Sequence, residues 1–209
     1  MKALDKQAQS AISPSAGIER LKEGNQRFLS KKQADRDLNQ QVKETTGGQY
    51  PFAAVLSCID SRVPAEIVFD QGIGDIFSAR VAGNFVNEDV LGSIEYACKV
   101  AGSKLVVVMG HTACGAVKGA CDDVELGNIT ALVSKIKPAV EAVKEPKEAD
   151  KRTSSNLDFV NAVSKKNVEK TLENMRSQSP LLKEMEDNGE IKIVGAMYDV
   201  SDGSVTFYN

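Results

Sequence analysis

The sequence predicts an α/β protein in which a mostly parallel central sheet is flanked by helices. Two apolar runs, residues 52–58 and 105–109, have the length of strands and do not alternate with polar residues. That pattern is typical of parallel strands buried on both faces. Segments with helical periodicity lie between the predicted strands, and this alternation of strand and helix indicates an α/β class. We expect a single domain over residues 1–209, with a helical arm at residues 1–30.

The N-terminal quarter predicts one clear helix. Residues 1–14 are polar and rich in Ala and Ser, which suggests an arm or a frayed helix. From Ser15 to about Leu29 the apolar residues recur at helical spacing after a Ser cap. Residues 31–50 are charged, rich in Gln and end in two glycines, so we interpret them as a surface connection.

Three further strands complete the predicted sheet. Residues 76–79 form a weaker apolar run than the first two, and residues 191–197 form a clearer one. Residues 204–208 follow an Asp-Gly turn, which favours an added edge strand.

The segments between the strands predict helices. Residues 88–101 place apolar side chains on one helical face, and residues 128–143 and 155–176 are longer amphipathic stretches. Pro180 suits the first turn of a short helix that ends before Gly189. The charged run at the end of the second stretch, residues 144–152, is interpreted as a solvated loop or helix face.

Composition excludes several classes of function. The 209 residues are 42% hydrophobic and 26% charged, which is ordinary for a globular protein. Lys and Arg number 26 against 29 Asp and Glu, a net charge of −3 that argues against nucleic-acid binding. No apolar run approaches the roughly 18 residues of a membrane span. The start carries no secretory signal pattern, so we expect a cytoplasmic protein, or a periplasmic one if a signal peptide has been removed.

Four cysteines and a single histidine stand out. Four cysteines are too sparse for a disulfide scaffold of this length, which leaves metal binding, catalysis or simple burial. The single histidine excludes any mechanism that needs two imidazoles.

Two short motifs follow the two most apolar strands. The first runs from Cys58 through Asp60 to Arg62, and the second contains His111 and Cys114 between two glycines. Ligands of open α/β sheets bind beyond the carboxyl ends of the strands, where the strand order reverses. If the two strands are neighbours, two thiols, an imidazole and a carboxylate meet there, and these are ligand types of zinc.

The spacing within each motif supports a shared site. His111 and Cys114 lie three residues apart, which brings both side chains to one side of a turn or helix. Cys58 and Asp60 share a face of extended chain. A carboxylate beside Arg62 can bind the metal or pair with the guanidinium. A lone Cys at a strand end is usually a buried small hydrophobe, but the combination favours a metal site; Cys98 and Cys121 are assigned to the core.

The order Cys-x-Asp-Ser-Arg followed by His-x-x-Cys resembles the beta-class carbonic anhydrases, over about residues 49–119. The resemblance implies that Cys58, His111 and Cys114 bind zinc, and that Asp60 and Arg62 form a catalytic dyad. It implies a substrate pocket that uses three side chains and one backbone N–H group. The matching residues are Gln49, Phe77, Tyr96 and Gly115.

The resemblance also implies the activity. It is the reversible hydration of carbon dioxide to bicarbonate and a proton by a zinc-bound hydroxide, which makes the protein a lyase. The resemblance also implies Asp60 as a possible fourth zinc ligand in a closed state, as in some family members. Family members are homodimers or homotetramers whose N-terminal helix wraps the partner and whose pocket is shared across the interface, so we expect such an oligomer and no nucleic-acid or membrane partner.

Three other interpretations were weighed. Residues 110–115 have the glycine spacing of a phosphate-binding loop, but the Lys and Ser or Thr that such a loop needs are missing. A structural zinc site closed by Cys121 is disfavoured, because seven helical residues separate it from Cys114 by about 10 Å. Hydrolysis of carbon disulfide at the same site remains an alternative.

Overall fold

The computed structural model describes residues 1–208, and within them five strands form one sheet in the order β2-β1-β3-β4-β5. The first four strands are parallel and β5 is antiparallel to β4. The fold class predicted from the sequence is therefore confirmed. The strands are β1 (Ala53–Ser57), β2 (Ile76–Arg80), β3 (Leu105–His111), β4 (Lys192–Tyr198) and β5 (Val205–Tyr208).

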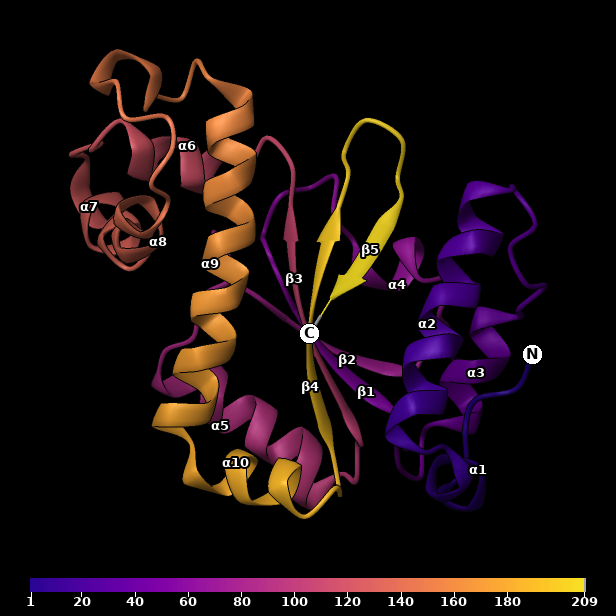
Figure 1. Cartoon of the computed structure of the whole chain (residues 1–209). Helices are drawn as coiled ribbons and strands as arrows, with labels where there is room; N and C mark the ends of the chain where they lie inside the picture. Colours follow the sequence, from indigo (N-terminus) through magenta and orange to yellow (C-terminus); the bar gives the residue numbers. More distant parts are fainter. Residues whose placement is uncertain (209) are drawn as a thin grey trace.

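Helices cover both faces of the sheet (Figure 1). On one face lie α1 (Lys6–Ala11), α2 (Pro14–Leu29), α3 (Leu38–Glu44) and α4 (Ala65–Val68). On the other lie α5 (Glu88–Glu95) with its π-helical extension (Tyr96–Val100), α9 (Leu157–Gln178) and α10 (Pro180–Asp187). Beyond the upper edge of the sheet in Figure 1, α6 (Gly115–Cys121), α7 (Gly127–Ser134) and α8 (Lys137–Ala142) pack near the start of α9.

The central strands are buried because both faces are covered. Every residue of β1 and β3 is buried. Alternate side chains of β1 enter two different cores: Val55 packs in the core with α2 and α4, and Leu56 packs in the core with α5, α9 and α10. This arrangement explains why the two apolar runs show no alternation.

The N-terminal helices are part of the chain's own core. α2 begins at Pro14, because Ser13 caps it by accepting a hydrogen bond from the Ala16 N–H at 3.2 Å. Leu21 of this helix is fully buried among side chains of the sheet. Residues 1–30 are thus largely helical, but α2 packs on its own sheet rather than projecting as an arm.

Two predicted segments differ in detail. The surface connection predicted at residues 31–50 contains α3, which Asp37 caps, and Gln41 of that helix is fully buried and accepts a hydrogen bond from the Ile73 N–H. The single amphipathic stretch predicted at residues 128–143 is two helices, α7 and α8, with Pro138 in the first turn of α8. Proline favours the start of a helix and disrupts its interior.

The charged run at residues 144–152 is mostly exposed, but the prediction is wrong for Arg152. A short 3₁₀ turn (Ala149–Lys151) precedes it. The Arg152 guanidinium donates hydrogen bonds to the carbonyl groups of Val140 and Val143. Its carbon atom lies 4.6 Å from the centroid of the Phe159 ring. Arg152 therefore closes the loop onto α8 and α9.

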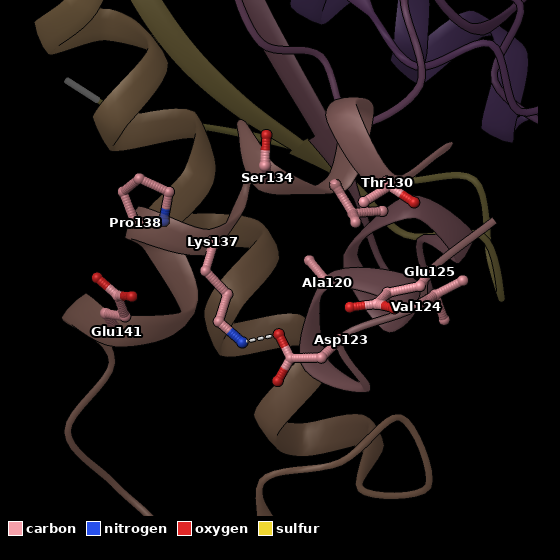
Figure 2. A pocket seen from close by; sticks show the side chains of 10 residues that line it. Ala120, Asp123, Val124, Glu125, Thr130, Ser134, Lys137, Pro138 and Glu141 are labelled. Carbon is pink, nitrogen blue, oxygen red and sulfur yellow. Dashed lines mark hydrogen bonds and ion pairs between the residues drawn. The ribbon is translucent and has the colours of Figure 1, made fainter. Parts of the chain in front are cut away.

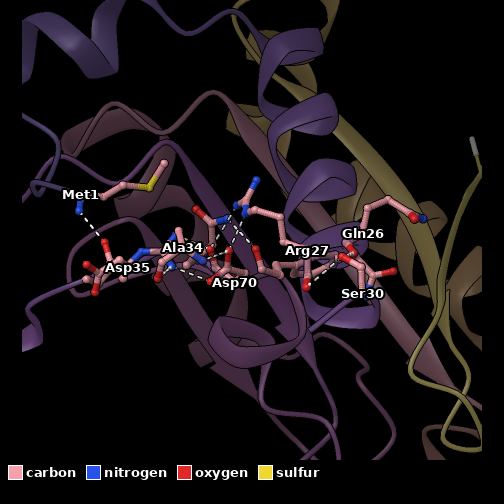
Figure 3. A network of polar contacts seen from close by, with 12 residues as sticks. Met1, Gln26, Arg27, Ser30, Ala34, Asp35 and Asp70 are labelled. Atoms are coloured by element: carbon pink, nitrogen blue, oxygen red, sulfur yellow. Dashed lines mark hydrogen bonds and ion pairs between the residues drawn. The ribbon is translucent and has the colours of Figure 1, made fainter. Parts of the chain in front are cut away.

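A buried ionic network fixes the layer of α2 and α4 (Figure 3). Asp70, two residues after the end of α4, is buried and accepts hydrogen bonds from the side chains of Arg27 and Arg36 and from the Ala34 N–H. Burial raises the pKa of the Asp70 carboxyl, but these hydrogen bonds lower it overall. The network joins α2, the segment that follows it and α4.

The strand order reverses next to β1. The chain passes from β1 to β2 on one side and returns to β3 on the other, so the connections from β1 and β3 diverge at their carboxyl ends. Such a reversal is the usual place for a ligand site in an open α/β sheet. Within residues 1–208, no helix is long and apolar enough to cross a membrane.

Candidate metal centre

Three side chains converge at the carboxyl ends of β1 and β3. These are the side chains of Cys58, His111 and Cys114, each of which offers one potential ligand atom. The three atoms lie within 4.8 Å of one another, and the two Sγ atoms are 4.0 Å apart. The three residues are buried, with exposed fractions of 3%, 0% and 1%. The structure thus brings together the three residues that the sequence analysis assigned as ligands.

The end of β3 places His111 and Cys114. His111 is the last residue of β3, and Cys114 is the N-cap residue of α6. Between them Ala113 turns the chain with a φ of 54°, in the left-handed region. The turn directs both side chains toward Cys58.

The histidine presents its Nε2 atom to the cluster. Nδ1 lies 2.9 Å from the carbonyl oxygen of Thr112 and donates a hydrogen bond to it. Nε2 is buried and has no hydrogen-bond partner among the described residues. A buried polar atom without a partner is uncommon in proteins, and here it faces two thiols.

The Cys58 thiol is held by the loop that follows β2. The Gly83 N–H donates to Cys58 Sγ at 3.4 Å. Arg80, the last residue of β2, donates to the carbonyl oxygens of Cys58 at 2.8 Å and Asp60 at 2.7 Å. The segment that carries Cys58 and Asp60 is therefore fixed through its backbone.

Asp60 and Arg62 form a bidentate ion pair at the mouth of the cluster. Arg62 Nε lies 2.9 Å from Asp60 Oδ1, and a terminal guanidinium nitrogen lies 2.8 Å from Oδ2. The Arg62 N–H also donates to Oδ1 at 3.0 Å, which closes a tight turn. The Arg62 side-chain hydrogen bonds hold the pKa of the Asp60 carboxyl well below its usual range. Oδ2 lies 3.9 Å from His111 Nε2, so the carboxylate borders the cluster.

The two cluster thiols differ in acidity. A hydrogen bond from Cys114 lowers the pKa of Cys58 to about 4 against the effect of burial, and His111 and the Gly83 N–H lower it further. The same contact and burial raise the pKa of Cys114. By contrast, burial raises the pKa of Cys98 to about 12 and that of Cys121 to about 11. A thiolate is thus favoured at the cluster and disfavoured at the two core cysteines.

The cluster fits a tetrahedral metal with sulfur and nitrogen ligands. Zinc with Zn–S bonds of about 2.3 Å places two sulfurs about 3.8 Å apart, close to the observed 4.0 Å. The Nε2 atom of His111, which has no hydrogen-bond partner among the described residues, could supply the third ligand atom. The Asp60 carboxylate borders the cluster, with Oδ2 3.9 Å from His111 Nε2.

The expected pocket residues lie elsewhere in the same chain. Gln49 is exposed and precedes β1, so the five residues of that strand, about 16 Å long, separate it from Cys58. Phe77 lies on β2 and meets Tyr96 edge-on at 6.3 Å between ring centroids, with Tyr96 half-exposed. Gly115 is the first residue of α6, beside Cys114. The single chain brings only Gly115 to the cluster.

Sequence reasoning missed three residues that hold the cluster in place. Arg80 and Gly83 act as described above, and the Ala113 N–H donates to Asn161 Oδ1 from α9 at 2.9 Å. Arg80 and Asn161 contact backbone atoms of residues far away in sequence, and Gly83 contacts the distant Cys58 thiol. A polar residue at a half-buried position of an amphipathic helix is the one signal that pointed to Asn161.

A separate hollow of about 400 Å³ lies between α6, α7 and α8 (Figure 2). Its lining residues lie within positions 120–141 and so do not include the three cluster residues. Asp123 pairs with Lys137 across it, and Glu125 and Glu141 add two more carboxylates. The excess of negative charge disfavours an anionic ligand there.

Comparisons with known proteins agree on one family. The family model described as carbonic anhydrase matches residues 53–205. Carbonic anhydrase 2 of Mycobacterium tuberculosis (strain CDC 1551 / Oshkosh) is 37% identical over 194 residues, which are 91% of this chain and 91% of that protein. The solved structure of the beta-carbonic anhydrase CcaA has a TM-score of 0.72 at 23% identity and covers 93% of this chain and 88% of its own. One of the structures described as two tetrameric beta-carbonic anhydrases from the ascomycete Sordaria macrospora has a TM-score of 0.69 at 23% identity, with 80% and 85% covered.

Proposed function

The chain belongs to the beta-class carbonic anhydrase family, and from this premise we propose that it catalyses the reversible hydration of carbon dioxide to bicarbonate and a proton. The observation that carries the proposal is the convergence of Cys58, His111 and Cys114 beside the Asp60–Arg62 pair. Both the ligand types and the neighbouring carboxylate suit this reaction.

We propose that the resident metal is zinc. Two thiolates and one neutral imidazole are a ligand set that zinc takes, and catalytic zinc sites keep a fourth position open. When bound, zinc supplies a Lewis acid that makes a strong nucleophile from water near neutral pH. Because two thiolates neutralise the charge of the metal, we expect weaker acidification than in a three-histidine site, whose water has a pKa of about 7. Activity should therefore rise with pH.

Asp60 is proposed to accept a hydrogen bond from the group at the fourth metal position, and Arg62 is proposed to orient the Asp60 carboxylate. Asp60 Oδ2 borders the open position, and Arg62 holds the carboxylate ionised and aimed at it. His111, the one histidine of the chain, is committed as a ligand. No imidazole is left to carry the proton onward, and the lowered pKa of Asp60 makes it a weak base, so we expect water and external buffer to carry the proton. Rotation of Asp60 away from Arg62 would let it take the fourth position in a closed state.

The substrate pocket is proposed to be completed by a second copy of the chain. Gln49, Phe77 and Tyr96 are accessible but distant from the cluster of their own chain. β2, which carries Phe77, is an edge strand whose outer side is not paired within residues 1–208. A homodimer or homotetramer that brings these residues to the neighbouring Gly115 would form the pocket, and the Sordaria proteins are described as tetrameric.

We also propose that residues 1–209 form one catalytic domain located in the cytoplasm. The three apolar cores all adjoin one sheet or its carboxyl end, which supports a single unit. A reducing compartment suits a site that needs two thiols in reduced form.

Substitution of one ligand tests the proposal. His111→Ala should lose zinc and hydration activity, whereas Cys121→Ala should keep both, because Cys121 lies outside the cluster. Zinc per chain is measured by atomic emission and hydration by stopped flow. Retention of zinc by His111→Ala, or loss by Cys121→Ala, would contradict the proposed ligand set.

A further inference from the structure

One peptide unit links the metal centre to α9. The Thr112 carbonyl oxygen accepts the hydrogen bond from His111 Nδ1 at 2.9 Å. The N–H of the same unit, which belongs to Ala113, donates to Asn161 Oδ1 at 2.9 Å. Because a peptide unit is planar and rigid, the direction of its N–H fixes the direction of its carbonyl. Asn161 and the imidazole ring are thus coupled through this plane.

The turn needs support from outside because its own sequence does not favour it. Ala113 has a φ of 54°, a left-handed conformation that costs roughly 1–2 kcal/mol for an L-residue and is normally taken by Gly or Asn. Alanine has no side-chain group to stabilise this conformation locally. A residue held there persists when its surroundings determine it.

The two sides of the turn are held by different elements. On one side the Thr112 N–H donates to the carbonyl of Tyr198, and the Thr112 hydroxyl accepts from the Val200 N–H at 3.0 Å and donates to Asp199 at 3.2 Å. On the other side stands Asn161. The end of β4 therefore fixes Thr112, and α9 fixes the following peptide plane.

Asn161 is well placed for this task by the packing of α9. It lies in the second turn of the helix, between Val160 and Val163, which are fully buried. Asn156 caps the helix by accepting from the Phe159 N–H. The packing of α9 thus places the backbone of Asn161 beside the turn, within reach of the Ala113 N–H.

We infer that Asn161 is a positioning residue of the metal centre, which acts through the Thr112–Ala113 peptide to hold the His111 ring with Nδ1 protonated and Nε2 directed at Cys58 and Cys114. The inference rests on the proposed metal site. Partners of the non-ligating nitrogen fix the tautomer and orientation of a metal-binding histidine, and their loss typically weakens metal binding by 10–100-fold. Since Asn161 acts one step further away, we expect a loss of about 10-fold.

Three variants test this inference. Asn161→Ala removes the acceptor, Asn161→Asp retains an acceptor oxygen, and Asn174→Ala makes the same truncation at an exposed position of the same helix. Zinc affinity is measured by competition with a chelator. His111 is the one histidine of the chain, so ¹⁵N-histidine labelling reports its ring alone. We expect a protected Nδ1–H signal in the metal-free wild type, in Asn161→Asp and in Asn174→Ala.

Asn161→Ala should lose the protected Nδ1–H signal and bind zinc about 10-fold more weakly, and Asn161→Asp should restore both. An unchanged signal and affinity in Asn161→Ala would overturn the inference. So would failure of Asn161→Asp to restore them, because the acceptor would then not be the cause. If the wild type itself binds no zinc, the proposed function fails, while the Nδ1–H signal of the metal-free protein still decides the role of Asn161.

Discussion

The close approach of α9 to β3 at Gly110 leads to a quantitative prediction. A Cβ atom added at Gly110 would lie 2.7 Å from Val168 Cγ2 and 2.9 Å from Met197 Sδ, whereas ordinary contacts begin near 3.4 Å. Gly110→Ala therefore requires the Val168 and Met197 side chains, or the elements that carry them, to shift by up to about 0.7 Å, and overpacking of this kind costs about 1–3 kcal/mol. For a chain of this length the melting temperature should fall by about 2–12 °C.

The same substitution in α5 supplies a matched control. A Cβ atom added at Gly92 would meet no described atom within 4 Å, and alanine is favoured over glycine within a helix by about 0.5–1 kcal/mol. Gly92→Ala should therefore raise the melting temperature slightly. Because His111 follows Gly110 directly, Gly110→Ala should also weaken zinc binding. Thermal unfolding followed by circular dichroism tests the pair, and a Gly110→Ala protein as stable as the wild type would refute the packing argument.

Three further predictions concern the site and the ionic network. Arg62→Ala should reduce the hydration rate by about 100-fold or more while zinc content stays near that of the wild type; an equal loss of both would show that Arg62 holds the metal instead. Asp70→Asn should destabilise the fold by about 3–5 kcal/mol in urea unfolding at pH 7, because it leaves Arg27 and Arg36 unpaired. Because the folded-state pKa of Asp70 is lowered, this stabilisation is present above the unfolded pKa near 4 and declines as pH falls through the folded pKa. The difference in unfolding free energy between the wild type and Asp70→Asn should therefore shrink in acid. A difference that stays constant with pH would contradict a lowered pKa. Turnover at saturating carbon dioxide should increase with buffer concentration, and independence from buffer would mean that the chain itself supplies the proton carrier.

The sheet and the clustering of Cys58, His111 and Cys114 were predictable from the sequence because their signals are local. A strand buried on both faces is an unbroken apolar run, and β1 and β3 are such runs. Cys58 follows the first, and His111 and Cys114 lie at the end of the second. The reversal of strand order between them then brings the residues together.

The details that sequence reasoning missed depend on tertiary contacts. α3 is short, and its buried Gln41 is stabilised by the backbone of Ile73, far along the chain. Asn161 matters because the close approach at Gly110 brings α9 to the turn at Ala113. The position of Asn161 on an amphipathic helix marks it as a polar residue near the core, but no local pattern in a single sequence identifies the partner of Asn161 or of Gln41.

The pocket residues depend on a further level of structure. Gln49, Phe77 and Tyr96 match the family pattern, but one chain does not carry them to its own cluster. Their proposed role would need a second copy of the chain, whose arrangement neither periodicity nor the single-chain fold specifies.

Cys58, His111 and Cys114 are proposed to hold the zinc ion with which the protein catalyses the hydration of carbon dioxide. The most direct measurement combines zinc content with stopped-flow hydration on one purified sample, at pH 7 and again near pH 9. The account predicts about one zinc per chain and fast hydration that increases at the higher pH, since two thiolates weaken the acidification of water. A sample without zinc, or one with zinc and no hydration at either pH, would contradict it.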